Sequence, residues 1–373
     1  MKQNLIITSS LIILGAALPD AWAATPYHYA NAITANNIAV MQHSIISTAM
    51  GASDRMAASV LRPEEIFKQQ AAKKTQQKVD PASIYGRAPM YGTAPMYGEY
   101  NDDGSIGRSG GDNAPTLGHA WFAWQHFGND TKFQDIHVLE SDLELAMIGL
   151  AGDKLQTEYG MSEWGLFTGY IGGDQTQQDL TINEDGGYFG AYKKLTAGRA
   201  AISFALNSGV LSNNIDAIAS DKTALTDDFT NIWAGGGFSA AYTIPMDDSF
   251  IFRPSIYAGY TWIKSDSYTT SSGDVIKNKD FHMFEISPAI RFIKHIGNGW
   301  FGAMHAKYVM IFDNGGETKV NGTELSTLES DHFTEYGLAL EKTIDRFNIT
   351  ANVGRRDGGH TGWVGGLNLK YIF

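Results

Sequence analysis

The side chains of this sequence that could support catalysis are histidines placed close to lysine or aspartate. His305 and Lys307 stand two positions apart, so they would share one face of a β-strand. His332 directly follows Asp331, and Asp–His pairs of this kind activate water in some hydrolases. Both patterns are short, and polar networks that perform no chemistry contain the same residues. We therefore expect neither pair to be catalytic.

The motifs of larger catalytic and metal centres do not occur in the sequence. It contains no HExxH, no CxxC and no P-loop. His119 and His126 would lie on opposite faces of one strand, and the acidic groups at 102–103, 112 and 227–228 lack the spacing of a calcium loop. We expect no catalytic residue, no metal site and no cofactor, and we expect that the chain is not an enzyme.

Charge and composition narrow the class of protein. The formal net charge is −12, which argues against nucleic acid as a partner. There is no cysteine, so disulfides cannot hold the chain together. Aromatic residues make up 12% and glycine accounts for 41 of 373 residues, a composition that suits β-strands joined by many turns.

The first 23 residues have the pattern of a secretory signal peptide. Lys2 gives a short basic start, positions 5–18 form an apolar run, and Ala21-Trp22-Ala23 fits the small-x-small cleavage rule. We expect cleavage after Ala23 and export from the cytoplasm, with an uncleaved anchor as the alternative. No later stretch reaches the length of an apolar membrane helix.

Two further regions precede the main domain. Residues 24–79 have helical periodicity, and a second helix would begin near Pro63. The apolar positions of the first helical run are Ile38, Met41, Ile45, Ile46 and Met50. Residues 80–114 contain a six-residue repeat that begins Tyr-Gly and holds Ala-Pro-Met, which predicts a Gly/Pro/Tyr-rich linker. A short aromatic docking stretch is the alternative for this linker.

From residue 115 onward the hydrophobic period becomes two, the period of β-strands. In the last segment Leu367, Leu369, Tyr371 and Phe373 share one face, while Lys370 lies on the other. Such segments recur about 12 times, with boundaries uncertain by about 2–4 residues, and the faces of the third are ambiguous. They lie at 117–127, 137–150, 161–173, 184–194, 198–208, 229–244, 250–264, 280–293, 300–312, 332–342, 346–355 and 361–373.

The connections and the polar faces favour a transmembrane barrel. Long polar connections at 209–228, 265–279 and 313–331 alternate with tight turns at 195–197, 245–249, 294–299 and 343–345. Outer-membrane barrels have this asymmetry, with short periplasmic turns and long external loops. Charged residues on the polar faces would then form a network in the lumen. Its expected members are Arg253, Glu285, Arg291, His305, Lys307, Glu335, Glu341 and Lys370.

The C-terminal residues resemble the assembly signal of outer-membrane barrels, which end in an aromatic residue preceded by alternating apolar residues. Residues 115–373 look more narrowly like the β-domain of autotransporters, the type V secretion proteins. Five motifs carry this resemblance by their order and their spacing to Phe373. They are Trp-Gly-Leu-Phe-Thr-Gly-Tyr at 164–170, Gly-Tyr-Phe-Gly-Ala-Tyr at 187–192, Pro-Ser-Ile-Tyr-Ala-Gly-Tyr at 254–260, Tyr-Gly-Leu-Ala-Leu-Glu-Lys at 336–342 and Arg-Arg-Asp-Gly-Gly-His-Thr-Gly-Trp at 355–363.

The resemblance implies an all-β transmembrane barrel of about 12 antiparallel strands in the Gram-negative outer membrane. It also implies insertion by the β-barrel assembly machinery, with outer-membrane lipid and periplasmic chaperones as further partners. Two departures stand out: the N-terminal region is short and without β-helical repeats, and the linker separates it from the first strand. Asn36-Asn37, which we expect before a helix, is similar to the cleavage site of some autotransporters.

Two functions follow from these expectations. The first is a translocator that displays or exports residues 24–79 as a short passenger, whose ligand the sequence does not indicate. The second is a self-standing porin-like channel or structural barrel, in which residues 24–79 would plug the pore or stay in the periplasm.

Overall fold

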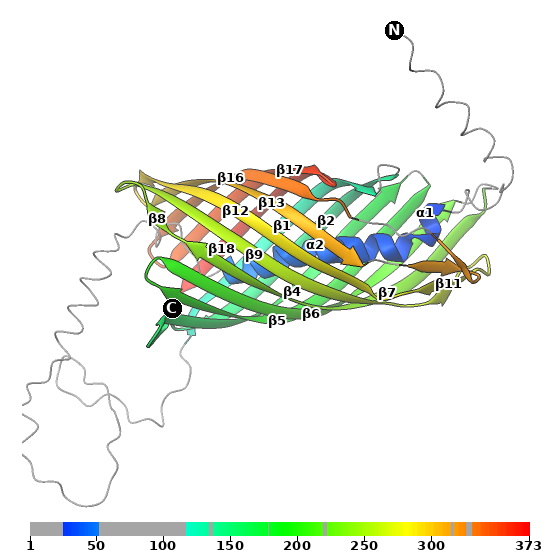
Figure 1. Ribbon diagram of the computed structural model, residues 1–373, viewed down its shortest axis with the longest axis horizontal. Helices are drawn as coiled ribbons and strands as arrows, with labels where there is room; N and C mark the ends of the chain where they lie inside the picture. The colour runs from blue at the N-terminus through cyan, green and yellow to red at the C-terminus, as the bar shows by residue number, and fades with distance from the viewer. Residues whose placement is uncertain are drawn as a thin grey trace, which may run out of the picture.

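The structure, a computed structural model, describes residues 25–51, 117–133, 137–177, 179–218, 222–314, 317–325 and 330–373. In these residues twelve long antiparallel strands close into one barrel that surrounds a helix (Figure 1). The first strand pairs with the last from His119↔Ile372 to Thr131↔His360, which closes the barrel. The expected fold class is confirmed. The barrel strands are β1 (Leu117–Phe133), β2 (His137–Gly152), β4 (Gly160–Gln177), β5 (Leu180–Ala197), β6 (Ala200–Ile218), β7 (Ala224–Tyr242), β9 (Phe250–Ser265), β12 (Phe281–Gly297), β13 (Trp300–Asn314), β16 (Phe333–Ile344), β17 (Phe347–Gly358) and β18 (His360–Ile372).

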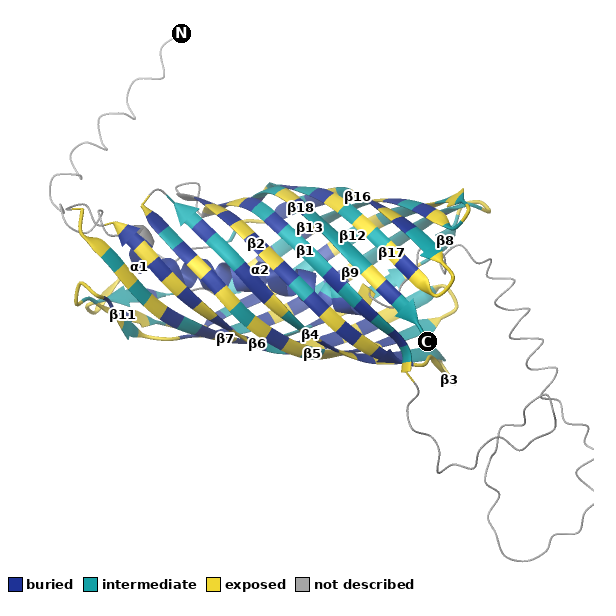
Figure 2. Cartoon of the chain, turned by 180° about the vertical axis from the view of Figure 1, so that it is seen from behind, coloured by how far each residue is buried: buried dark blue, intermediate teal, exposed yellow. Residues whose placement is uncertain are grey.

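The two ends of the barrel differ. At one end, which we call the turn end, pairs of residues such as Gly198-Arg199, Asn298-Gly299 and Asp345-Arg346 connect the strands. Gly198, Asn298 and Asp345 have φ of 58°, 50° and 49°, a conformation that glycine, asparagine and aspartate tolerate best. Short strands β3 (Leu155–Thr157) and β8 (Ile244–Pro245) lie in other connections at this end. The C-terminus also lies there (Figures 1 and 2).

The opposite end, which we call the loop end, carries the longest connections. Residues 268–278 and 318–324 contribute to a small separate sheet of four strands, which we call the loop sheet. Its strands are β10 (Tyr268–Thr269), β11 (Val275–Asn278), β14 (Thr318–Val320) and β15 (Thr323–Glu324). The expected asymmetry between long loops and tight turns is therefore present.

Several expected strand limits are wrong, and the largest errors arise because strands run further toward the loop end than expected. The expected loop 209–228 is largely strand, because β6 and β7 stay paired to Ile218↔Ala224. The expected turn at 195–197 still belongs to β5, which pairs with β6 as far as Ala197↔Ala200. Asn213, which looks like a loop residue, is buried and donates to Asn231 at 2.9 Å. Polar residues on these strands mark their extension toward the loop end rather than a break in pairing.

Exposed and buried residues alternate along the strands, as Figure 2 shows by colour. On β12 the side chains of Phe284 and Ile290 are 43% and 42% exposed, whereas Glu285 and Ser287 are 3% and 2% exposed. Since successive side chains of a strand point to opposite faces, apolar residues cover the outside and polar residues face the interior. This is the reverse of a soluble barrel.

A helix fills much of the interior. The short α1 (Thr25–His28) leads into α2 (Ala30–Gly51), and most side chains of α2 are buried. α2 runs from the loop end toward the turn end (Figure 1). Within the described residues no helix is long and apolar enough to cross a membrane. The signal peptide, the expected helix near Pro63 and the linker 80–114 lie outside the described residues.

Candidate functional site: a plugged lumen

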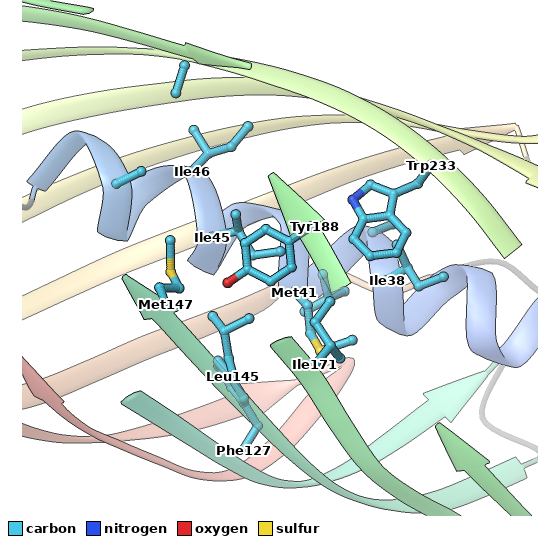
Figure 3. Packing of buried hydrophobic residues seen from close by; sticks show 14 of the residues in the cluster. Ile38, Met41, Ile45, Ile46, Phe127, Leu145, Met147, Ile171, Tyr188 and Trp233 are labelled. Carbon is cyan, nitrogen blue, oxygen red and sulfur yellow. The ribbon is translucent and has the colours of Figure 1, made fainter. Parts of the chain in front are cut away.

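Apolar side chains of α2 pack against the wall formed by β1 to β7. Ile38, Met41, Ile45 and Ile46 are each at most 3% exposed, and burial of one such side chain stabilises by about 1.5–3 kcal/mol. Their surroundings are apolar side chains that point inward from the barrel (Figure 3). These include Phe127, Leu145, Met147, Ile171, Tyr188 and Trp233. The lumen on this side is thus a hydrophobic core rather than a water-filled channel.

Glycines on β7 allow the helix to come close. A Cβ atom at Gly235 would collide with the side chain of Gln42, and one at Gly237 would lie 2.9 Å from Cγ2 of Ile46. The intervening Gly236 faces the other way, toward Leu206. The inward glycines therefore form a seat for α2 that a larger residue would remove.

Polar residues of α2 find partners on the wall. The side-chain amides of Gln42 and Asn207 bond to each other in both directions, and Asn207 Nδ2 donates to Gln42 Oε1 at 2.9 Å. Gln125 Nε2 donates to Thr48 Oγ1 at 2.9 Å. Because a buried polar group without a partner costs about 1–3 kcal/mol, these contacts fix where along the barrel the helix can rest.

A charged contact joins α2 to the other wall. His43 Nδ1 lies 2.5 Å from Glu285 Oε1, and its Nε2 lies 3.1 Å from Lys307 Nζ. A lysine ammonium can only donate, so Nε2 is the acceptor and the ring proton is on Nδ1, facing Glu285. Tyr257 packs edge-on against the imidazole at 4.6 Å between ring centres. His43 thus links two wall residues that the sequence placed in the lumen.

Glu335 is the centre of the lumenal ion pairs. Lys307 Nζ lies 3.1 Å from Glu335 Oε1, His305 Nε2 lies 3.6 Å from the same oxygen, and Arg356 Nε donates to Oε2 at 2.9 Å. Lys307, Glu335 and Arg356 are direct cross-strand neighbours on β13, β16 and β17. The structure therefore brings three of the expected lumenal residues together.

Arg356 was absent from the expected network, although its position could have indicated it. It continues the even-numbered polar face of Asn352 and Gly354 on the same strand. Its guanidinium also lies 5.1 Å from the ring centres of Phe127 and Phe333.

The other expected lumenal residues lie nearer the turn end. Arg253, Arg291, Glu341 and Lys370 line one cavity together with Met50 and Gly51, the last residues of α2. Arg253 on β9 and Arg291 on β12 are directly opposite each other in the strand pairing. All eight residues that the sequence assigned to the lumen accordingly face the interior or its cavity.

The histidines considered for catalysis contact residues of the barrel wall. His332 Nδ1 accepts from the backbone amide of Ile311 at 3.1 Å. His119 is buried while His126 is on the outside, 3.3 Å from Asp142, so the two are on opposite faces as expected. The part of the chain that the structure describes has no cluster of three or more potential metal ligands from His, Cys, Asp and Glu.

The Asn36-Asn37 pair lies inside the barrel, in α2. Both side chains are buried. Asn36 Nδ2 donates to Ser330 Oγ, and Asn37 Nδ2 donates to Ser141 Oγ at 3.4 Å. The pair is thus held within the helix rather than before it.

The C-terminal strand presents the expected apolar alternation to the outside. Leu369 and Phe373 are exposed, Leu367 and Tyr371 are half-buried, and Lys370 is buried on the other face. Tyr371 contacts the rings of Phe347 and Phe373 at 4.9 and 5.3 Å between centres. An aromatic cluster therefore marks the end of β18.

A closed twelve-stranded barrel with an apolar exterior, tight turns at one end and charged residues on part of its inner wall is the architecture of an outer-membrane protein. The profile of the family "Autotransporter beta-domain" matches residues 145–362, more than half of the chain. The chain belongs to this family, and it is an outer-membrane barrel with a translocator-type β-domain. The number of strands is even, so the beginning of β1 and the end of β18 both lie at the turn end. That end is therefore periplasmic, and the loop end is external.

Solved structures of the same class have this fold. The β-domain of the Bordetella autotransporter BrkA is 15% identical, with a TM-score of 0.57 over 69% of this chain and 100% of that chain. The translocator domain of NalP from Neisseria meningitidis is 12% identical, with a TM-score of 0.59 over 69% and 89%. The transport unit of AIDA-I from Escherichia coli is 14% identical, with a TM-score of 0.55 over 71% and 93%. No curated protein matches the chain significantly in sequence.

Proposed function

We propose that this barrel carries its own N-terminal segment through the pore and keeps α2 there as a resident plug, with the N-terminus presented at the cell surface. In this proposal residues 1–23 direct export, and the barrel performs no enzymatic reaction. The observation that supports it is the direction of α2, which begins at the external end and ends near the periplasmic turns. Translocation of an N-terminal segment would leave the helix in this direction.

Contacts at the external end hold the beginning of the helix. Tyr27, Tyr29 and Ile33 belong to a buried cluster, here called the outer cluster, with inward residues of the barrel rim. The rim residues include Leu139, Leu180, Ile182, Ile215 and Phe229. His28 Nε2 lies 3.5 Å from Asp274 of the loop sheet, and Asn31 Nδ2 donates to the carbonyl oxygen of Asp266 at 3.3 Å. Cleavage after Ala23 would place the mature N-terminus directly beside this cluster, so the displayed passenger would be only a few residues.

A porin-like channel is the second candidate function. The observation in its favour is the polar cavity beside the end of α2, which would widen into a pore if the helix left. Against it stands the apolar packing of α2 on β1 to β7, which closes the rest of the lumen. Conductance distinguishes the two candidates. In planar bilayers the full chain should conduct little, and removal of residues 25–51 should increase the conductance strongly, whereas a self-standing channel would conduct at full length.

Surface labelling tests the orientation of the plug. The chain has no cysteine, so single cysteines report unambiguously. With a membrane-impermeant maleimide on intact cells, Thr25→Cys should be labelled. Val275→Cys on the loop sheet is the matched external control, and Asp345→Cys in a turn should be labelled only after permeabilisation. Labelling of Asp345→Cys but not of Thr25→Cys on intact cells would refute this orientation.

We also propose that the β-barrel assembly machinery inserts the chain through its C-terminal strand, with periplasmic chaperones delivering it and outer-membrane lipid surrounding it. The exposed alternation that ends at Phe373 supports this. Deletion of Phe373 should reduce the amount of heat-modifiable barrel in the membrane, whereas Ile372→Ala, on the other face, should not. Equal amounts of heat-modifiable barrel in the wild type, the Phe373 deletion and Ile372→Ala would refute a role for Phe373.

A further inference from the structure

One carboxylate inside the barrel has surroundings unlike those of the others. Five glutamates are buried among the residues that the structure describes, and four of them have a basic side chain close by. These pairs are Glu163 with Lys154, Glu285 with His43, Glu335 with Lys307, and Glu341 with Arg291. The fifth, Glu184 on β5, is 3% exposed and has no basic neighbour in the described part of the chain. The charged group that does act on it is Asp174, another carboxylate.

Neutral polar side chains surround Glu184 in the external part of the lumen. Gln175 on β4 donates from Nε2 to Glu184 Oε1. Asn213 on β6 is the direct cross-strand partner of Glu184. From the helix, Thr34 is close enough for its hydroxyl to act on the same carboxylate. Three adjacent strands and α2 therefore meet at one buried negative charge.

The amide of Asn213 is held in place by β7 and, through β7, by the helix. Its Nδ2 donates to Asn231 Oδ1 at 2.9 Å and to the carbonyl oxygen of Phe229 at 3.3 Å. Asn231 Nδ2 in turn donates to Asn31 Oδ1 of α2 at 3.3 Å. Because the amide nitrogen of Asn213 is directed toward β7, its Oδ1 is left for the side of β5, where Glu184 lies.

Four oxygen atoms of this group have no hydrogen-bond partner among the described residues, and we call them the oxygen cluster. They are Thr34 Oγ1, Gln175 Oε1, Glu184 Oε2 and Asn213 Oδ1. The four side chains are at most 3% exposed, so bulk water does not satisfy these atoms. Buried polar groups are normally hydrogen-bonded, and buried charges are normally paired or coordinate metal ions. The oxygen cluster thus has the properties of a ligand set for a positive ion.

We propose that the oxygen cluster binds a sodium ion between α2 and the barrel wall. Carboxylate, amide and hydroxyl oxygens are the ligands that hard metal cations prefer. The cluster contains a single carboxylate, so a monovalent cation neutralises its charge, whereas a divalent cation would leave a buried positive excess. Asp174 changes this balance little, because it is only half-buried and water and salt screen its charge.

The position of the site gives the ion a structural role. Ile182 and Ile215, two residues along the same strands from Glu184 and Asn213, belong to the outer cluster. The outer cluster therefore covers the site on its external side. An ion held by Thr34 of the helix and by three wall strands ties the plug to the barrel. The site is independent of whether the N-terminus is displayed.

Urea unfolding of the refolded full chain in sodium chloride, compared with choline chloride at the same concentration, tests the proposal. We expect a higher midpoint in sodium chloride, because the native state alone binds the ion and choline is too large for a cluster of four oxygens. Glu184→Gln, which keeps the shape of the side chain, should abolish the difference between the salts. Asp185→Asn is the matched control, since Asp185 is the next residue and is exposed on the outer face. This control should keep the whole difference.

Equal midpoints of the wild type in the two salts, or a sodium effect that persists in Glu184→Gln, would overturn the proposal. A midpoint raised by calcium chloride at equal ionic strength but not by sodium chloride would overturn it as well, because the site would then be divalent.

Equilibrium dialysis with radioactive sodium provides a second readout that does not depend on unfolding. The wild type should bind one sodium ion per chain, and Thr34→Val should bind it about tenfold more weakly or worse, since even indirect contacts of a metal site contribute that much. Asp185→Asn should bind like the wild type. If no sodium is bound and Glu184→Gln raises the urea midpoint in both salts, the carboxyl group is protonated in the native state and the proposal fails.

Discussion

His43 Nδ1 lies 2.5 Å from Glu285 Oε1, a contact between the helix in the lumen and a wall strand in which both side chains are at most 6% exposed. Removal of the imidazole would leave the buried carboxylate without its partner on the helix. We expect His43→Ala to lower the free energy of unfolding by about 1–3 kcal/mol, because a buried polar group that loses its partner is costly. Urea unfolding in lipid vesicles measures this loss.

The control for His43→Ala is Ser47→Ala on the same helix. Ser47 Oγ bonds only locally, to the carbonyl oxygen of Ser44 at 3.3 Å. Its replacement should therefore change the stability by a few tenths of a kcal/mol, the usual range away from buried networks. Equal losses in the two variants would contradict the importance of the His43–Glu285 contact.

The glycine seat on β7 gives a prediction about pore closure. Gly235→Leu should expel α2 from its seat and raise single-channel conductance in planar bilayers, since the new side chain occupies the space of Gln42. Gly236→Leu, one residue away on the outer face, should leave the conductance low. A closed pore in both variants would show that the helix does not rest on these glycines.

The alternation on β12 predicts accessibility at each position. Nitroxide labels at 284 and 290 should be relaxed by oxygen dissolved in lipid, because these side chains point outward. A label at 287, which lines the cavity, should respond instead to a water-soluble relaxation reagent. Ile290→Arg should cost about 2–4 kcal/mol in bilayers, the range for arginine at the lipid midplane. Equal lipid exposure at odd and even positions would invalidate the face assignment.

The sequence predicts the barrel well where the lumen is polar. On β9, Ile256 and Tyr260 are exposed while Tyr257 and Thr261 are buried, so apolar and polar residues separate by face as expected. The segment 161–173 was ambiguous for a physical reason. Its inward residues Phe167 and Ile171 are apolar because they contact the core around α2, so both faces of β4 are hydrophobic. The unclear pattern was itself a sign that the lumen is filled.

Other features depend on long-range contacts that periodicity does not contain. The helical spacing from Ile38 to Met50 indicates a helix, but the choice of the lumen as its place depends on partners such as Asn207. The polar residues at 209–228 indicate contact with water. A loop and a strand that extends beyond the membrane are both in contact with water, so this pattern does not distinguish them. The pairing of Arg253 with Arg291 follows only from the register of β9 on β12.

Asp274 predicts how the external contacts respond to acid. The Asn321 amide first, and then Ser272 and His28, hold the pKa of this carboxyl below its usual range by hydrogen bonding to its charged form. A lowered folded pKa stabilises the folded state above the unfolded value of about 3.9, and this contribution is lost as the pH falls through the folded pKa. Hydrogen exchange of residues 268–278, corrected for intrinsic rates, should therefore accelerate below about pH 4. In Asp274→Ala the exchange should already be fast at neutral pH and show no such transition; the same transition in both proteins would assign it to another group.

Cross-linking between α2 and β6 tests the plugged barrel most directly. The side chains of Gln42 and Asn207 are hydrogen-bonded inside the lumen, whereas Leu206, the next residue on β6, is exposed on the outside. In a chain without native cysteine, a short bis-maleimide should link Gln42→Cys to Asn207→Cys in membranes and give a distinct gel mobility after heating. It should not link Gln42→Cys to Leu206→Cys. Efficient linkage of the first pair alone is the predicted result, and failure of the first pair, or equal linkage of both pairs, would contradict the account.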